Sequence, residues 1–302
     1  MMKNIDNTVS HYSELHEKVC NLFEETICMT PLAVNCWETE TGRGVTSVIQ
    51  HGNIIEKGGI NFSFVHGHVS PNMKKILGEE ALYYHVTGIS SVMHPVNPYV
   101  PIIHMNVRYF SLDNGTEWFG GGIDLTPHYI DQQEAISFHR SLKKICDRYD
   151  VQFYPRLKKW ADDYFYLPHR KELRGVGGIF FDRIKPGKDL SFDKLLNFTI
   201  DLGDAYPRMY KEIVMDKSEI AFSDRESKWQ NLRRGRYIEF NLIHDRGTKF
   251  GLESGRNIEA TFISLPASAS WEYNFEPIPG SPESNTMSLL KQKEIDWVNF
   301  KV

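Results

Sequence analysis

Histidine, asparagine and arginine side chains alternate with apolar ones along one short segment, 103–112. Side chains of a β-strand repeat every two residues, so a strand here places His104, Asn106 and Arg108 on one face. An arginine holds a carboxylate with two parallel hydrogen bonds, and a histidine exchanges protons near neutral pH. The row therefore indicates a site for an anionic substrate. The alternative is the solvent-facing polar side of an edge strand.

A run of three glycines lies in segment 118–127 and is followed closely by Asp124. Glycine allows a backbone to approach a flat ligand closely or to adopt positive φ. Asp124 is then placed to accept hydrogen bonds from ligand N–H groups. The segment has neither the Lys-Ser/Thr pair of a phosphate loop nor the glycine spacing of a dinucleotide site. The alternative is a tight turn that Asp124 caps.

Histidines are the second candidate group. Imidazole is both a common metal ligand and a general acid or base near neutral pH. The spacing of these histidines fits no compact metal motif, so it favours separate, hydrogen-bonded core histidines. His66 and His68 share a strand face and leave the same two interpretations open. The four histidines that a fold could bring together are His94, His104, His139 and His169.

Basic residues gather in a third stretch, 233–243, where Tyr237, Glu239 and Asn241 alternate with apolar residues. The basic residues are too few for a nucleic-acid surface but suffice for a small polycarboxylate. For the first two arginines, the interpretation as a helix C-terminus is preferred. Segment 245–249 is expected to form a turn, and Gly255-Arg256-Asn257 follows it.

These groups need elements to position them. Helices are expected where apolar residues recur at helical spacing, and residues 131–149 open with a capping-box pattern. Strands are expected in segments rich in β-branched and aromatic residues. Strands and helices do not alternate regularly, which favours an α+β fold, a mainly antiparallel sheet covered by helices. The expected helices are 11–29, 131–149, 155–167, 191–215, 224–234 and 283–299, and the expected strands are 58–66, 87–94, 103–112, 176–183, 236–244 and 257–265.

Composition limits the possible functions. The chain has 302 residues and a formal net charge of −4, which argues against a dedicated nucleic-acid binder. The aromatic share of 13% and the 12 histidines suggest a planar ligand and proton or metal chemistry. No linker divides the chain, so a single domain over 1–302 is expected. The four cysteines fit no zinc or redox spacing, no apolar run spans a membrane, and a cytoplasmic location is expected.

Many words of this sequence, in one order from about Trp37 to the C-terminus, resemble the oxygen-dependent coproporphyrinogen III oxidase family. The longest are WFGGGIDLTP at 118–127, GVGGIFFD at 175–182 and RRGRYIEFNL at 233–242. The others are GINFS at 59–63, VHG at 65–67, HP at 94–95, NPYVP at 97–101, NVR at 106–108, YPR at 154–156, KW at 159–160, DDYFY at 162–166, DRG at 245–247, WEY at 271–273 and GSPE at 280–283.

The resemblance implies a flat antiparallel sheet between helical layers and a homodimer that forms through residues 237–272. It also implies oxidative decarboxylation of two propionate side chains of coproporphyrinogen III to vinyl groups. The products are protoporphyrinogen IX, CO2 and H2O2, within haem biosynthesis. O2 is the implied co-substrate, a manganese-like divalent metal is implied for some members, and neither flavin nor haem is implied.

Residue roles follow from the same resemblance. Arg108 corresponds to a clamp for a substrate carboxylate, Asp124 faces the pyrrole N–H groups, and His104 matches the proton donor. The substrate contacts beside Arg108 correspond to Ser90, Asn106 and Val107. The metal ligands of bacterial members correspond to His94, His104, His139 and His169.

The second substrate-contact segment departs from the family pattern. Within Gly255, Arg256 and Asn257, the arginine stands one place earlier than is usual, and asparagine occupies its place. This departure motivates a competing hypothesis, a tetrapyrrole-binding carrier without catalytic activity. A third hypothesis is a metal-dependent hydrolase that uses the histidines, but the sequence lacks any HExxH motif.

Overall fold

A seven-stranded antiparallel sheet forms the centre of the computed structural model, which describes residues 2–69, 74, 80–254 and 258–302. The strand order is β1-β2-β3-β4-β5-β6-β9, so each strand except β9 pairs with its neighbour in the chain. This confirms the expected α+β fold. The strands are β1 Ala33–Thr39, β2 Gly42–Gln50, β3 Ile55–His68, β4 Tyr83–Pro95, β5 Ile102–Leu112, β6 Glu117–Thr126 and β9 Gly177–Ile184; β7 Tyr166–Leu167 and β8 Glu172–Leu173 form a separate pair.

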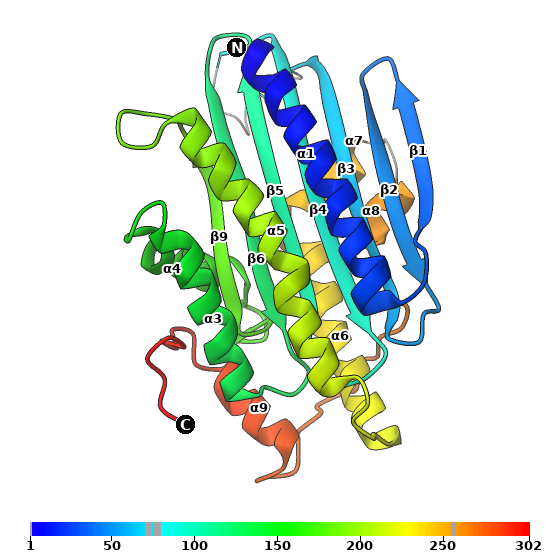
Figure 1. Ribbon diagram of the computed structural model, residues 1–302. Coiled ribbons are helices and arrows are strands. Elements are labelled where there is room, and N and C mark those ends of the chain that lie inside the picture. Colours follow the sequence, from blue (N-terminus) through cyan, green and yellow to red (C-terminus); the bar gives the residue numbers. More distant parts are fainter. Residues whose placement is uncertain (1, 70–73, 75–79, 255–257) are drawn as a thin grey trace.

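Helices cover both faces of the sheet (Figure 1). Helices α1 and α5 cross one face, with α3 beside α5, while α6, α7 and α8 lie behind the sheet in this view. Helix α4 packs along β9 at the edge. The helices are α1 Met2–Phe23, continued by the π-helix Glu24–Cys28, α3 Gln132–Asp147, α4 Phe153–Tyr164, α5 Phe192–Lys217, α6 Asp224–Ile243, α7 Arg246–Ser254, α8 Ile258–Phe262 and α9 Pro282–Leu290.

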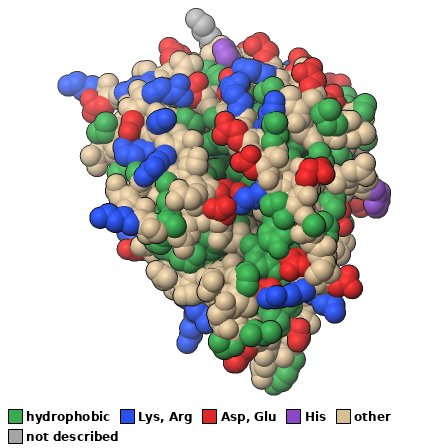
Figure 2. Space-filling view, turned by 60° about the horizontal axis from the view of Figure 1, so that its bottom comes forward, with side chains coloured by type: hydrophobic (Ala, Val, Ile, Leu, Met, Phe, Trp, Pro, Cys, Tyr) green, Lys and Arg blue, Asp and Glu red, His purple; other side chains and the backbone are tan. Residues whose placement is uncertain are grey.

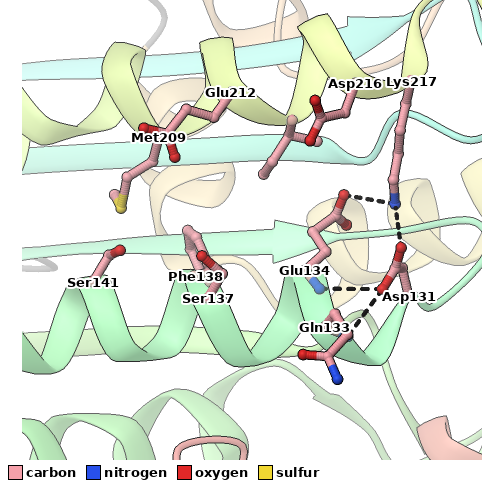
Figure 3. Close-up of a pocket in the computed structure, with 11 residues that line it drawn as sticks. Asp131, Gln133, Glu134, Ser137, Phe138, Ser141, Met209, Glu212, Asp216 and Lys217 are labelled. Atoms are coloured by element: carbon pink, nitrogen blue, oxygen red, sulfur yellow. Dashed lines mark hydrogen bonds and ion pairs between the residues drawn. The ribbon is translucent and has the colours of Figure 1, made fainter.

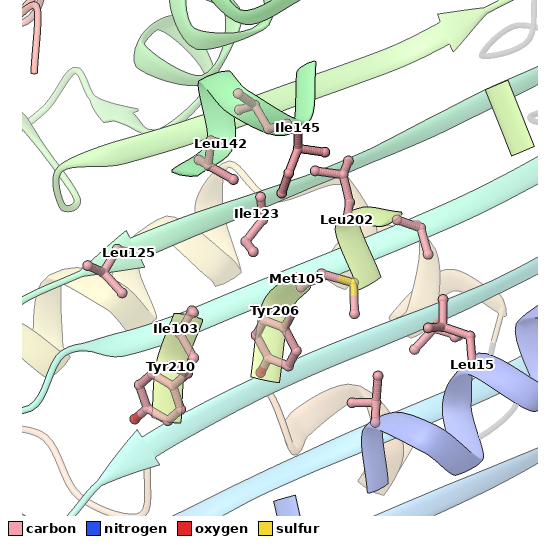
Figure 4. Packing of buried hydrophobic residues seen from close by; sticks show 14 of the residues in the cluster. Leu15, Ile103, Met105, Ile123, Leu125, Leu142, Ile145, Leu202, Tyr206 and Tyr210 are labelled. Atoms are coloured by element: carbon pink, nitrogen blue, oxygen red, sulfur yellow. The ribbon is translucent and has the colours of Figure 1, made fainter. Parts of the chain in front are cut away.

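The face under α1 and α5 carries the main hydrophobic core. Alternate residues of β5 point into it, among them Met105, which meets Leu15 of α1 and Tyr206 of α5 in one cluster (Figure 4). Burying such a side chain stabilises the fold by about 1.5–3 kcal/mol. Since apolar residues of β5 take this face, the polar residues between them are left on the opposite face, under α6.

Two expected strands are helices instead. Segment 236–244 continues α6, and most of 257–265 belongs to α8. Helix α6 starts with a capping box between Ser223 and Glu226. It then buries Tyr237, Phe240 and Asn241, whose spacing of three and four residues fits a helix; the apparent alternation was a fragment of that pattern.

Gly235 does not end α6, which also corrects the placement of the first two arginines near a helix C-terminus. A Cβ atom at Gly235 would lie 2.6 Å from the Ser270 carbonyl oxygen, so the glycine permits close packing inside the helix. Arg233 and Arg234 are therefore mid-helix and buried. They pair with Glu172 at 2.7 Å and with Glu56 at 2.6 Å respectively.

Other boundaries also differ from expectation. The glycine run lies inside strand β6, so the tight-turn alternative is wrong. The expected turn at 245–249 falls largely in α7, and the last helix ends at Leu290. Strands β1 and β2 were not expected; β1 is an edge strand in which every residue except the half-buried Trp37 is exposed. Asp131 caps α3 as expected, accepting hydrogen bonds from the Gln133 and Glu134 amides.

The surface agrees with the near-neutral charge. On the face in Figure 2, acidic and basic side chains are interspersed and hydrophobic ones gather in a band. Within the described ranges, no helix combines the length and apolarity needed to cross a bilayer.

Candidate active site

A cavity of about 350 Å³ lies on the polar face of the sheet, between the central strands and α6, α7 and α8. The predicted row on β5 is confirmed, because His104, Asn106 and Arg108 all line this cavity. Aromatic side chains of Tyr164 and Phe180 provide part of the apolar wall.

The antiparallel register builds the floor of the cavity from aligned residues. Directly paired residues point to the same face of a sheet. One row across the strands consists of Thr46, Asn61, Ser90, Asn106 and Gly122. The side-chain oxygens of Asn61 and Asn106 are buried and accept no hydrogen bond from the described residues. Because a buried acceptor without a donor is costly, these two oxygens suit a ligand that brings its own donor groups.

Asp124 sits beside His104 in the next row, since the two residues are paired across β5 and β6. His104 Nδ1 lies 2.8 Å from Asp124 Oδ1, and the Arg174 guanidinium pairs with the other carboxylate oxygen. Burial alone would raise the pKa of Asp124, which is only 2% exposed. The charge of Arg174 and the hydrogen bond from His104 outweigh burial, so the pKa lies below its usual value and Asp124 is ionised at neutral pH.

The geometry also assigns a tautomer to His104. A carboxylate only accepts hydrogen bonds, so His104 Nδ1 carries the proton that it donates to Asp124. Nε2 then lies 3.4 Å from the Asn106 side-chain nitrogen. His104 and Arg174 line the cavity, whereas Asp124 lies behind them and is not part of the lining.

Arg174 was not singled out from the sequence, yet it is central to the site. Its guanidinium carbon lies 4.3 Å from the ring centre of Phe165 and 4.6 Å from those of Tyr237 and Phe240. Cation–π contacts of this kind stabilise a guanidinium away from water. A single arginine between β8 and β9 carries no spacing signal, so only the fold reveals it.

Arg108 is the most accessible cation of the cavity wall, with 34% of its side chain exposed. Its nearest acidic partner is Asp182, at 3.7 Å from Nη2, which is too long for a hydrogen bond. Gly120, paired with Arg108 across the strands, leaves it room: a Cβ atom there would lie 2.9 Å from both Arg108 Nε and Asp182 Oδ1. The guanidinium is therefore placed to take an incoming carboxylate.

The opposite wall adds a second carboxylate, Asp245, which follows α6. Asp245 accepts hydrogen bonds from the Thr248 amide at 2.6 Å, the Thr248 hydroxyl at 2.8 Å and the Tyr164 hydroxyl at 2.8 Å. Burial would raise the pKa of Asp245, but these bonds lower it below the usual value. The sequence placed Asp245 only in an expected turn.

The other histidines lie in separate environments. His94 is buried edge-on against Tyr237 and bonds the Ser264 carbonyl, while His139 bonds Tyr154 and the Val176 carbonyl. His169 bonds Glu239 at 2.8 Å.

Metal binding by His94, His104, His139 and His169 does not fit this arrangement. Across the described ranges, no group of three or more histidines, cysteines, aspartates or glutamates is placed to hold a metal. Burial lowers the pKa of His139 to about 3, in agreement with a neutral core residue.

The remaining predicted contacts lie differently. Ser90 is on the cavity face and exposed, whereas the Val107 side chain is fully buried on the opposite face, so only its backbone is near the cavity. Gly255, Arg256 and Asn257 lie outside the described residues.

A second cavity, of about 270 Å³, lies between α3 and α5 (Figure 3). Lys217 lies 2.7 Å from Glu134 and 3.2 Å from Asp131, and Glu212 and Asp216 add two further carboxylates. With four carboxylates around one lysine, this cavity repels an anionic substrate. The cavity on the sheet is therefore the candidate active site.

Comparison with known proteins gives one family. A family model described as coproporphyrinogen III oxidase matches residues 7–297. An oxygen-dependent coproporphyrinogen-III oxidase of Drosophila melanogaster is 42% identical over 301 residues, which cover 94% of this chain and 76% of the relative. The mitochondrial enzyme of the same name from Mus musculus is 41% identical over 302 residues, which cover 95% of this chain and 67% of the relative. A Francisella tularensis relative of the same name is 44% identical over 85% of this chain and 84% of its own length.

Proposed function

The chain belongs to the coproporphyrinogen III oxidase family, and we propose that it uses O2 to decarboxylate two propionate side chains of coproporphyrinogen III. The product is protoporphyrinogen IX, and CO2 and H2O2 are released. The chain is thus an oxidoreductase of haem biosynthesis.

One observation supports this function most directly, the arrangement of Arg108, His104 and Arg174 along one wall of the cavity. A porphyrinogen carries carboxylates on its edge and N–H groups at its centre. Arg108 and His104 are four residues apart on one strand, which separates them by about 13 Å. This spacing suits a propionate carboxylate bound at Arg108 and a reacting pyrrole ring near His104.

The reaction balances without a further oxidant. For each propionate, the bond to the carboxyl group breaks, CO2 leaves, and the electron pair forms the vinyl double bond. The neighbouring carbon loses a hydrogen with its electron pair to O2, and a proton taken up from solvent completes H2O2, because the bound propionate is already ionised. Positive charge develops on the pyrrole ring as that hydrogen leaves, so groups that stabilise this charge lower the barrier.

The chain supplies this stabilisation and the required orientation. Arg108 holds a propionate carboxylate by charge-assisted hydrogen bonds. Asp124 accepts a hydrogen bond from a pyrrole N–H, for which its carboxylate has lone pairs beyond those used by His104 and Arg174. The His104 ring stands in front of Asp124 and turns aside to admit the pyrrole. Its Nε2 is the atom that exchanges a proton during the reaction. No step is assigned to a metal.

A homodimer through residues 237–272 is part of the proposal. Support comes from apolar side chains that this segment leaves exposed: Leu242, Ile243, Leu252, Ile258 and Trp271. An exposed apolar patch of this kind is typical of an interface. The cytoplasmic location stays a prediction.

The test is a reaction started by oxygen. The protein is mixed with coproporphyrinogen III without air, and O2 is then added while CO2 and porphyrinogen products are followed. Formation of protoporphyrinogen with CO2 supports the proposal. Tight binding without any CO2 would instead identify a carrier, and activity on other substrates that is lost on chelation would identify a hydrolase.

A further inference from the structure

Imidazole rings gather on the sheet face opposite the cavity, near the end of β3 and the start of β4. His66 of β3 and His85 of β4 are direct partners in the register, and the next pair along the ladder is His68 and Tyr83. Phe62 and Ile89, which precede them on this face, belong to the core under α1. The four side chains therefore lie away from the candidate active site.

The rings lie close to one another. The ring centres of His66 and His85 are 6.0 Å apart, and each lies within 6 Å of the ring centre of Tyr83, at 5.9 and 5.3 Å. The Tyr83 hydroxyl lies 2.6 Å from His66 Nδ1. Phe64 stacks in parallel on His85 at 6.3 Å and holds that ring in place.

Directly opposed residues of an antiparallel pair have Cβ atoms about 4.5–5.5 Å apart. Two imidazoles on such a pair reach a common point above the sheet, and the rigid strands fix their positions. Binding of an ion therefore costs no backbone conformational entropy at His66 or His85. The arrangement is thus prepared for chelation.

Charge around the pair also favours a cation. Burial, followed by the nearby His66, lowers the pKa of His85, and the carboxylates of Asp6 and Asp113 act on it in the opposite sense. A neutral imidazole offers the lone pair that a metal needs. The two carboxylates provide negative potential without occupying the rings.

We propose that His66 and His85, with the Tyr83 oxygen beside them, bind a late first-row divalent metal ion such as Cu²⁺, Ni²⁺ or Zn²⁺. Imidazole nitrogen suits these ions, whereas Ca²⁺ and Mg²⁺ prefer oxygen ligands. Two imidazoles and one phenol leave further coordination positions to water, so the site is open. A bound ion clamps β3 to β4 at their exposed end.

The experiment uses the tag-free full chain and the metal ions alone. Zn²⁺ is titrated calorimetrically, and Cu²⁺ is followed by electron paramagnetic resonance, which counts coordinating nitrogens. The variants are His85→Phe, which keeps a ring on Phe64, and Tyr83→Phe. One control is His11→Gln, which replaces a half-exposed imidazole on α1 that bonds the Asn7 carbonyl. The other is His244→Gln, because His169 and His244 form another stacked pair, at 5.5 Å.

We expect one Zn²⁺ per chain and a Cu²⁺ spectrum with two nitrogens in the wild type. His85→Phe weakens Zn²⁺ binding at least tenfold, Tyr83→Phe weakens it less, and both controls bind as the wild type does. Absence of binding to the wild type, or unchanged binding in folded His85→Phe, overturns the proposal. If His85→Phe does not fold, the proposal is overturned by a Cu²⁺ spectrum of the wild type that lacks two coordinating nitrogens. Oxidase activity of His85→Phe stays at the wild-type level, which separates this site from the proposed function.

Discussion

The Asp124 carboxylate and the Arg174 guanidinium form an ion pair in which both side chains are 3% exposed. Asp124 comes from β6, and Arg174 lies between β8 and β9, enclosed by Phe165, Tyr237 and Phe240. His104 completes the group from β5. A carboxylate behind the cavity wall is thereby kept ionised where water does not reach it.

Replacing Arg174 with methionine leaves the Asp124 charge buried and unpaired. Breaking a buried pair in this way costs about 3–5 kcal/mol, so the free energy of unfolding falls by that amount in urea titrations. Adding Asp124→Asn to Arg174→Met removes the charge and restores most of the stability, but not the turnover. The control Arg148→Met breaks an exposed pair with Asp201 and costs about 1 kcal/mol or less. Equal losses for Arg148→Met and Arg174→Met would contradict this account.

Arg108→Ala removes the proposed carboxylate clamp. A hydrogen bond to a charged group is worth about 1.5–3 kcal/mol, so kcat/KM falls roughly ten- to a hundredfold, mostly through KM. Arg108→Lys keeps the charge but loses the paired hydrogen bonds, and its kcat/KM lies between the two. Steady-state kinetics measure all three proteins. Arg208→Ala on α5 serves as the control, since Arg208 is exposed and pairs with Asp204. Wild-type kinetics of Arg108→Ala would remove its assigned role.

Glu134 makes stability depend on pH. Burial raises the pKa of Glu134, 8% exposed, to about 7, although Lys217 opposes this. The folded pKa exceeds the unfolded value of about 4.3, so the protein loses stability as pH rises from about 4.5 to 7.

Glu134→Gln escapes this loss. Relative to the wild type, it gains at most roughly 3 kcal/mol between pH 5 and pH 8, measured by urea unfolding at both. Glu212→Gln, at an exposed position of the same cavity, shows no such gain. If the free energies of unfolding of Glu134→Gln and the wild type differ by the same amount at pH 5 and pH 8, the raised pKa of Glu134 is contradicted.

Ile243→Asp tests the proposed dimer. Ile243 is 49% exposed at the end of α6, and a charge there opposes burial in an apolar interface. Sedimentation velocity should show a dimer for the wild type and a monomer for the variant. Ile220→Asp, 42% exposed and outside 237–272, should remain dimeric. A monomeric wild type, or a dimer that tolerates aspartate at Ile243, speaks against this interface.

Local patterns predicted a good part of this molecule. The alternation in 103–112 gave both strand β5 and the shared face of His104, Asn106 and Arg108, because a strand period of two leaves few other arrangements. The same alternation in 236–244 was misleading. Tyr237, Glu239 and Asn241 alternate with apolar residues as in a strand. The burial of Tyr237 and Phe240, three residues apart, fits a helix instead.

What local patterns missed depends on contacts between distant residues. Arg174 has no neighbouring motif, and its role arises from the Phe165 ring just after α4, the Tyr237 ring on α6 and a carboxylate on β6. Asp245 was read as part of a turn, yet Tyr164 reaches it from 81 residues away. The pairing of His66 with His85 likewise depends on the register of β3 and β4. The sequence pattern connected His66 only with His68, which lies on the same strand.

The most direct test of the whole account compares the wild type with Asp124→Asn in the reaction started by O2. Asparagine keeps the size of the side chain but removes the charge that accepts a pyrrole N–H. We expect the wild type to release one CO2 and one H2O2 for each vinyl group formed. Asp124→Asn should bind coproporphyrinogen III at Arg108 with little change in Kd and release CO2 at least a hundredfold more slowly, as for loss of one electrostatic stabiliser. Release of CO2 by Asp124→Asn at the wild-type rate would contradict the account.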